Sequence, residues 1–226
     1  MNALVRMRVA GFVRGGRALA PLIAVLVELG VIYGGGASPA ASAYGYSAVA
    51  LFPVLAWLTK LLLDTEPDVQ RRLARLTVGP RREATAGVLA ALILSLIVCV
   101  AAMVAPWAFG GIDTSVALGS GIVLGVLAHL LAVPAAVALG ALSSRAVTGS
   151  IRLGVAVLVV SAVLVVVLGL NDSFAPWLVP PIMATARALN DPVVPPAATM
   201  IGLTAWTALW CTAVFAGYGW LRRARS

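Results

Sequence analysis

Long apolar runs separated by short polar segments dominate the chain. Six runs are long enough, or nearly so, to cross a bilayer as helices, which takes about 20 residues at a rise of about 1.5 Å per residue. They cover residues 18–33, 44–63, 83–107, 116–142, 153–170 and 200–221. This pattern predicts an all-α integral membrane fold, with six transmembrane helices in a single domain over residues 1–226.

The N-terminal segment, residues 1–17, mixes arginines with apolar side chains, as a basic amphipathic helix on a membrane face does. A cleavable signal peptide is the alternative, because Ala41 to Ala43 has the small residues of a cleavage site. Against it, Glu28 interrupts the apolar run, and the candidate site lies about ten residues beyond Tyr33. We therefore expect an interface helix followed by a retained first span.

The segment 64–82 is the longest polar, charged run in the chain, and residues 65–78 within it are predicted to form a short helix. Thr65 is expected to cap its N-terminus. Asp68, three residues later, would complete a capping box, and Pro67 suits the first turn. Gly79 and Pro80 are expected to end the helix.

One face of this short helix is apolar, because Val69, Leu73 and Leu76 recur at helical spacing. We expect its arginines to face water or an acidic partner. The pattern favours docking onto a soluble protein, although an ordinary solvated loop helix has the same pattern. The candidate docking residues are Asp68, Val69, Arg71, Arg72, Leu73, Arg75 and Leu76.

Residues 171–199 contain six prolines, so no unbroken helix passes through them. A short helix from Pro181 to Asn190 is expected to lie at the outer surface. This segment therefore predicts broken outer helices between the fifth and sixth spans.

Composition and charge agree with a membrane protein. Hydrophobic residues make up 62% of the chain and charged residues 11%, whereas soluble domains carry roughly a quarter charged residues. With both termini inside, fifteen of the sixteen Lys and Arg fall on the inner side and Arg187 alone on the outer side. The positive-inside rule then predicts cytoplasmic termini and explains the net charge of +8 without a nucleic-acid partner.

A family resemblance is found in residues 71–92, which have the sequence RRLARLTVGPRREATAGVLAAL. It resembles the coupling helix, Gly-Pro break, basic residues and small-residue span entry of permease subunits of ABC-2 type ATP-binding-cassette exporters. The order of elements along the whole chain is also similar. Two departures, the missing Gly-Thr before the coupling helix and the missing Lys at the start of the third span, leave the subfamily and the substrate (drug, peptide or lipid) open.

The resemblance implies a six-span subunit that faces a second permease subunit, identical or similar, in the lipid of a bacterial plasma membrane. The coupling helix would dock a separate soluble ATPase. The chain has no GxxxxGK[ST] phosphate loop, so it is expected to be a transport subunit and not itself an enzyme. It needs no cofactor of its own, because ATP and Mg²⁺ would bind the partner ATPase.

Four residues within the apolar runs are candidates for a translocation path: Glu28, His129, Trp206 and Trp210. Glu28 and His129 lie at similar depth and could meet. A carboxylate at mid-membrane is a functional hypothesis by default, but a paired structural acid is an equal alternative. His129 and the two tryptophans also suit simple packing. Cys99 and Cys211 are expected to be buried thiols. Because the chain has one histidine and no CxxC motif, we expect no metal site built from its side chains.

Two other function classes remain. A self-sufficient secondary transporter would use Glu28 to carry protons and need no ATPase partner, but no inverted repeat is visible. An integral-membrane enzyme would need several polar groups at one depth in the membrane, and the apolar runs place only Glu28 and His129 at similar depth.

Overall fold

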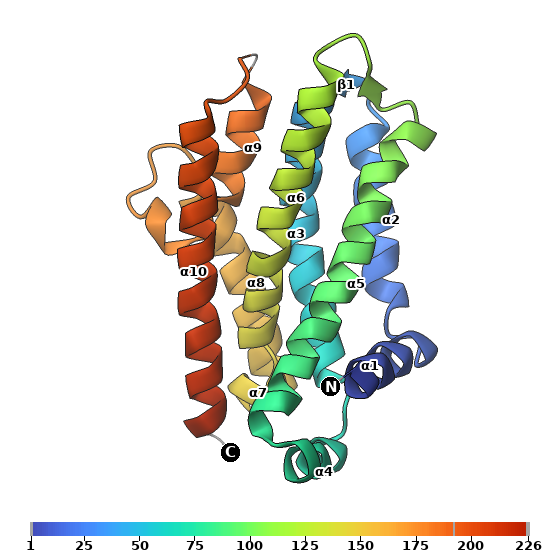
Figure 1. Ribbon diagram of the computed structural model, residues 1–226, viewed down its shortest axis with the longest axis vertical. Coiled ribbons are helices and arrows are strands. Elements are labelled where there is room, and N and C mark those ends of the chain that lie inside the picture. Colours follow the sequence, from blue (N-terminus) through green and yellow to red (C-terminus); the bar gives the residue numbers. More distant parts are fainter. Residues whose placement is uncertain (1, 192, 225–226) are drawn as a thin grey trace.

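The computed structural model describes residues 2–191 and 193–224, apart from the side chain of Asp68, and this part of the chain is almost entirely helical (Figure 1). The long helices are α3 (Ala40–Asp64), α5 (Pro80–Ala108), α6 (Leu118–Leu142), α8 (Ile151–Leu168) and α10 (Ala197–Ala224). Among the residues described, these five, with α6 continued by α7 (Arg145–Thr148), are long and apolar enough to cross a membrane. The all-α prediction is confirmed.

The first apolar run forms α2 (Leu19–Tyr33), and the basic segment before it forms α1 (Asn2–Arg14). The two helices are bent by 74° relative to each other, and only together are they long enough to count as a sixth candidate span. One face of α1 is buried against the protein and carries Val5, Arg8 and Phe12. The sharp bend turns α1 away from the axis of α2, and the buried face of α1 packs against α5 and α3.

Helices α3 and α6 form the centre of the bundle and approach each other closely. A Cβ added at Gly125 would lie 2.5 Å from Tyr44 Cδ2, and one at Gly140 would lie 2.4 Å from the Ala56 carbonyl oxygen. Gly121 likewise lies against Ala40. Gly121 and Gly125, four residues apart on α6, therefore mark a site of close helix packing.

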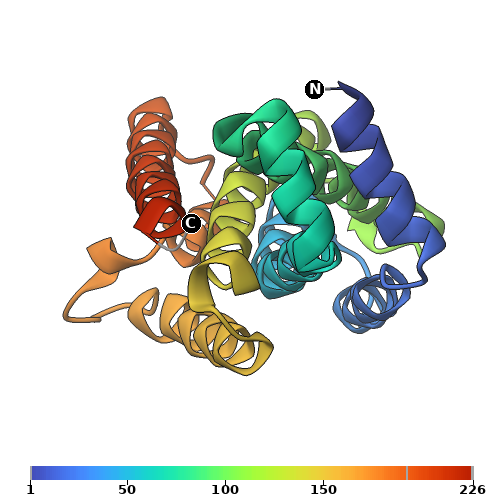
Figure 2. The same ribbon diagram turned by 90° about the horizontal axis from the view of Figure 1, so that it is seen from below.

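Helices α1, α4 (Asp68–Val78), α7 and the last turn of α10 lie at one end of the bundle, called here the α4 end (Figure 1). Seen from that end, α4 lies between α1 and α10 (Figure 2). At the opposite end, β1 (Ser38–Pro39) pairs in parallel with β2 (Ile112–Asp113). The polar segments of the chain are thus gathered at the two ends of an apolar bundle.

The sides of the bundle expose large apolar residues. They include Leu26 on α2, Val100 on α5, Val159 on α8 and Leu209 on α10. Soluble monomers rarely expose apolar surface on this scale, so the sides of the bundle are suited to contact with lipid or with other membrane helices.

The segment between α8 and α10 is broken as predicted, into the 3₁₀ turn η1 (Pro176–Leu178) and α9 (Ile182–Asn190). Helix α9 lies toward the end of the bundle opposite α4 (Figure 1), with one face packed against α3. Ala186 and Leu189 pack against Gly45 of α3, because that glycine leaves room for them. Arg187 donates to the Gly169 carbonyl oxygen at 2.6 Å, which satisfies the C-terminal end of α8.

Candidate functional site

Helix α4 begins three residues later than expected. Thr65 does not cap it, because the Thr65 hydroxyl donates back to the Leu61 carbonyl oxygen at 2.7 Å and so completes the last turn of α3. Pro67, in an extended conformation, precedes the first helical residue, and no side-chain hydrogen bond caps that end. The proposed capping role of the Asp68 side chain falls outside the described residues. Gly79, with φ 86°, ends α4 as predicted.

The apolar stripe of α4 faces away from the protein. Val69 is 69% exposed, Leu73 57% and Leu76 83%. The Arg72 side chain is exposed beside them. Three large apolar side chains on one open helix face, outside the apolar bundle, form a surface that is suited to a partner.

The opposite face of α4 is fixed to the bundle by two arginines. Arg71 is buried and donates to the carbonyl oxygens of Leu63 (3.2 Å) and Glu66 (3.4 Å). The expectation that all arginines of this helix face outward is therefore wrong for Arg71. The physical reason is that the carbonyls of Leu63, in the last turn of α3, and of Glu66, in the link to α4, lack helical partners and accept from this guanidinium instead. Arg75 lies 3.6 Å from the Glu83 carboxylate.

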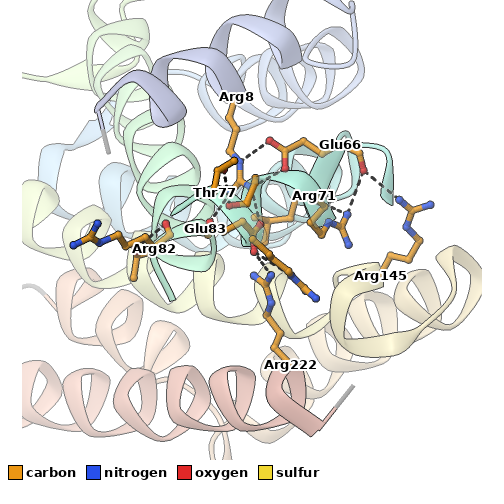
Figure 3. Close-up of polar contacts among 12 residues, drawn as sticks. Arg8, Glu66, Arg71, Thr77, Arg82, Glu83, Arg145 and Arg222 are labelled. Atoms are coloured by element: carbon orange, nitrogen blue, oxygen red, sulfur yellow. Dashed lines mark hydrogen bonds and ion pairs between the residues drawn. The ribbon is translucent and has the colours of Figure 1, made fainter. Parts of the chain in front are cut away.

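Glu83 is the centre of a buried ion-pair network behind α4 (Figure 3). Its side chain is 2% exposed. One carboxylate oxygen accepts from Arg8 at 2.6 Å, and the other accepts from Arg222. Arg222 also donates to the Tyr218 hydroxyl at 2.8 Å. A single carboxylate of α5 thus joins α1, α4 and α10.

Arg8 extends this network to the link between α3 and α4. It contacts Glu66 through two hydrogen bonds, 2.7 Å from Nε and 2.6 Å from Nη2, and it donates to the Glu83 carbonyl oxygen at 2.9 Å. Burial works against the charge on Arg8, but the hydrogen bonds and charges of Glu66 and Glu83 outweigh it and raise the pKa of Arg8. This guanidinium remains charged and holds both carboxylates.

A second ion pair lies beside the first network. Lys60 contacts Asp64, four residues later on α3, at 2.6 Å. Lys60 is buried and does not reach open solvent, because α8 passes over it at Gly154. The other Asp64 oxygen accepts from the backbone N–H of Arg145 at 2.7 Å, at the start of α7. The C-terminal end of α3 is thereby joined to α7 and α8.

The sequence missed Arg8, Glu66, Glu83 and Arg222 as a group. Arg8 and Glu83 are 75 positions apart, and Glu83 and Arg222 are 139 apart. One signal was available, since Glu83 is an acid at the entry of an apolar run that is otherwise flanked by arginines. Its partners could not be assigned without the packing of the helices.

The structure does not bring Glu28 and His129 together. His129 is buried between α3 and α6, with Nδ1 2.8 Å from the Gly125 carbonyl oxygen and Nε2 3.2 Å from Ser47 Oγ. Its ring also packs edge-on against Tyr44. These contacts satisfy both nitrogens and give His129 a packing role. Glu28 Oε2 is buried and has no hydrogen-bond partner in the described part of the chain.

The two candidate tryptophans lie half-buried on α10. The Trp210 indole donates to the Leu178 carbonyl oxygen at 2.9 Å, which ties α10 to η1. Neither Trp206 nor Trp210 lines a cavity of about 740 Å³ between α5 and α10. Cys99 and Cys211 are free and buried, and the described residues contain no group of three His, Cys, Asp or Glu side chains that could hold a metal ion.

Comparisons with protein-family models, with curated proteins and with solved structures found no match. The exposed helix α4 and the ion pairs behind it are therefore the features of this chain that bear on its function.

Proposed function

We propose that this chain is the permease subunit of an ATP-driven ABC-2 type exporter and that α4 is its coupling helix. The observation that carries the proposal is the two-sided character of α4. Its outer face exposes Val69, Leu73 and Leu76, while its inner face is joined to the bundle through Arg71 and Arg75. A docking helix needs both an apolar contact surface and a firm connection to the moving helices.

The ion pairs supply a route for that connection. A displacement of α4 would act on Glu83 through the Arg75 ion pair, which at 3.6 Å is longer than a hydrogen bond, and Glu83 is hydrogen-bonded to Arg8 of α1 and Arg222 of α10. Buried, hydrogen-bonded ion pairs resist separation, because an unpaired charge left in the interior is costly. Movement of a docked ATPase would in this way reach α1, α5 and α10 together.

In this proposal α1 lies on the cytoplasmic membrane face, α2 forms the first of six spans, and the α4 end faces the cytoplasm. The bend of 74° between α1 and α2 and the basic residues at the α4 end support this arrangement. A second permease subunit, identical or similar, would complete the path in a bacterial plasma membrane. ATP and Mg²⁺ would bind only the partner ATPase.

The docking surface is tested by placing a charge on it. Leu73→Asp introduces a carboxylate into the apolar stripe, whereas Gln70→Asp adds the same charge at an exposed polar position of α4. Burying an unpaired carboxylate at an interface is costly. We expect Leu73→Asp to lower the amount of a phosphate-loop ATPase that co-purifies with the tagged chain at least tenfold, and Gln70→Asp to leave it near the wild-type amount. Equal recovery with both variants would contradict docking through this stripe.

A second candidate function is proton-coupled secondary transport through Glu28. The observation in its favour is the buried Glu28 Oε2 without a hydrogen-bond partner. This function requires that Glu28→Gln abolish transport driven by a proton gradient in vesicles that contain the chain alone. Unchanged transport by Glu28→Gln between about pH 5 and pH 8 would leave the residue a structural role.

A further inference from the structure

A groove between α5 and α10 opens at the α4 end of the bundle. It has a volume of about 740 Å³, and Pro134 of α6 contributes to its lining. The groove lies close to the Glu83–Arg222 ion pair, since Arg222 is also one of its lining residues. None of the candidate translocation residues lines it, so it is separate from the path considered above.

The walls of this groove are apolar along most of their length. Val88, Leu89 and Leu92 of α5 face Phe215 of α10. The lining of α5 runs from Pro80 to Leu92, about 18 Å along a helix axis. This length is close to half of the hydrocarbon thickness of a bilayer, about 15 Å. The groove therefore has the depth of one leaflet.

The mouth of the groove is basic. Arg81 of α5 and Arg223 of α10 lie at the end nearest α4, together with Arg75 and Arg222, which contact Glu83. No acidic side chain belongs to the lining that the structure describes. The N-terminus of α5, at Pro80, adds the positive end of a helix dipole. An apolar slot of one-leaflet depth with arginines at its mouth is complementary to a molecule with an anionic head and a hydrocarbon chain.

We propose that this groove binds an anionic phospholipid from the leaflet at the α4 end, with its phosphate at Arg81 and Arg223 and an acyl chain between α5 and α10. A second copy of the chain is disfavoured as occupant, because its described acids at the α4 end, Asp64, Glu66 and Glu83, are already paired with its own basic residues and offer the arginines of the mouth no partner. Free phosphate would leave the apolar walls uncovered. The proposal does not depend on docking of an ATPase.

The test is native mass spectrometry of the full-length chain, with any subunit that co-purifies, in mild detergent with equal amounts of phosphatidylglycerol and phosphatidylcholine. Arg81→Gln is compared with Arg82→Gln, which removes the same charge from the next, exposed residue outside the groove. We expect the wild type and Arg82→Gln to retain phosphatidylglycerol preferentially. Arg81→Gln should lower its retention about fivefold, the effect of one basic residue near an anionic lipid surface.

A second pair of variants tests the apolar walls. Ala84→Trp fills the groove, whereas Ile97→Trp places the same side chain at an exposed site of α5 outside it. Only Ala84→Trp should abolish lipid retention. The proposal is overturned by equal retention in the two arginine variants, by equal retention of both lipids, by displacement with inorganic phosphate, or by disulfide-linked dimers of a Leu89→Cys variant.

Discussion

Glu83 shows what one residue contributes to the α4 end. Its carboxylate is shared by Arg8 and Arg222 and lies 3.6 Å from Arg75. Three positive charges on separate helices would repel one another in this buried place without it. The Glu83 charge therefore holds α1, α4 and α10 against α5.

We expect Glu83→Gln to destabilise the folded chain by about 3–5 kcal/mol, the usual consequence of removing one partner from a buried ion pair. The amide keeps the size of the side chain but leaves Arg8 and Arg222 without a compensating charge. The measurement is thermal unfolding of the purified chain in detergent. Arg82→Gln, at an exposed neighbouring position, serves as the control and should keep the wild-type Tm. An unchanged Tm for Glu83→Gln would show that the network contributes no stability.

At the scale of elements, the sequence predicted most of the helices and missed how two of them end or pack. The apolar runs gave the long helices to within a few residues, because membrane-length apolar helices are set by composition. Thr65 has the chemistry of an N-cap, yet its hydroxyl bonds within α3. Arg71 turns inward to carbonyls that only the turn between α3 and α4 brings near it. These hydrogen bonds depend on tertiary contacts, which the spacing of apolar residues along the sequence does not encode.

The candidate site likewise has one part that the sequence predicted and one part that it did not. The stripe of Val69, Leu73 and Leu76 is a local pattern, and its exposure could be anticipated from the polar context of the segment. The network around Glu83 could not be anticipated from the sequence, since its members come from four helices. Likewise, Glu28 and His129 share a depth in the sequence pattern, but His129 turns toward Ser47.

The close packing of α3 and α6 gives a prediction about an element pair. A methyl group at Gly125 would come within 2.6 Å of Tyr44 Cβ, whereas one at Gly202 of α10 would meet nothing within 4 Å. We expect Gly125→Ala to destabilise the fold by about 1–3 kcal/mol, as overpacking of a core does. Gly202→Ala should be neutral or slightly stabilising, because alanine favours a helix. Thermal unfolding of both variants in detergent measures the difference, and equal Tm values would contradict the packing of α3 on α6.

At the scale of the whole molecule, the basic residues gather at the α4 end, and the proposed orientation in the membrane rests on this asymmetry. The proposed topology places Arg82 in the cytoplasm and Val193 outside, and both side chains are exposed. In intact cells, a membrane-impermeant maleimide should label Val193→Cys. It should label Arg82→Cys, which lies outside the apolar stripe of α4, only after the membrane is opened. The two native cysteines are buried and give little background. The reverse pattern would invert the topology.

The account as a whole depends on α4 contacting a soluble ATPase, and a photoreactive side chain at Leu76, its most exposed apolar position, tests this most directly. A photoreactive side chain at Ile97 on the side of the bundle is the control. Irradiation of living cells should join position 76, and not position 97, to a soluble protein with a phosphate-loop motif. A position 76 that gives only lipid adducts, or none, would contradict the assignment of α4 as a coupling helix.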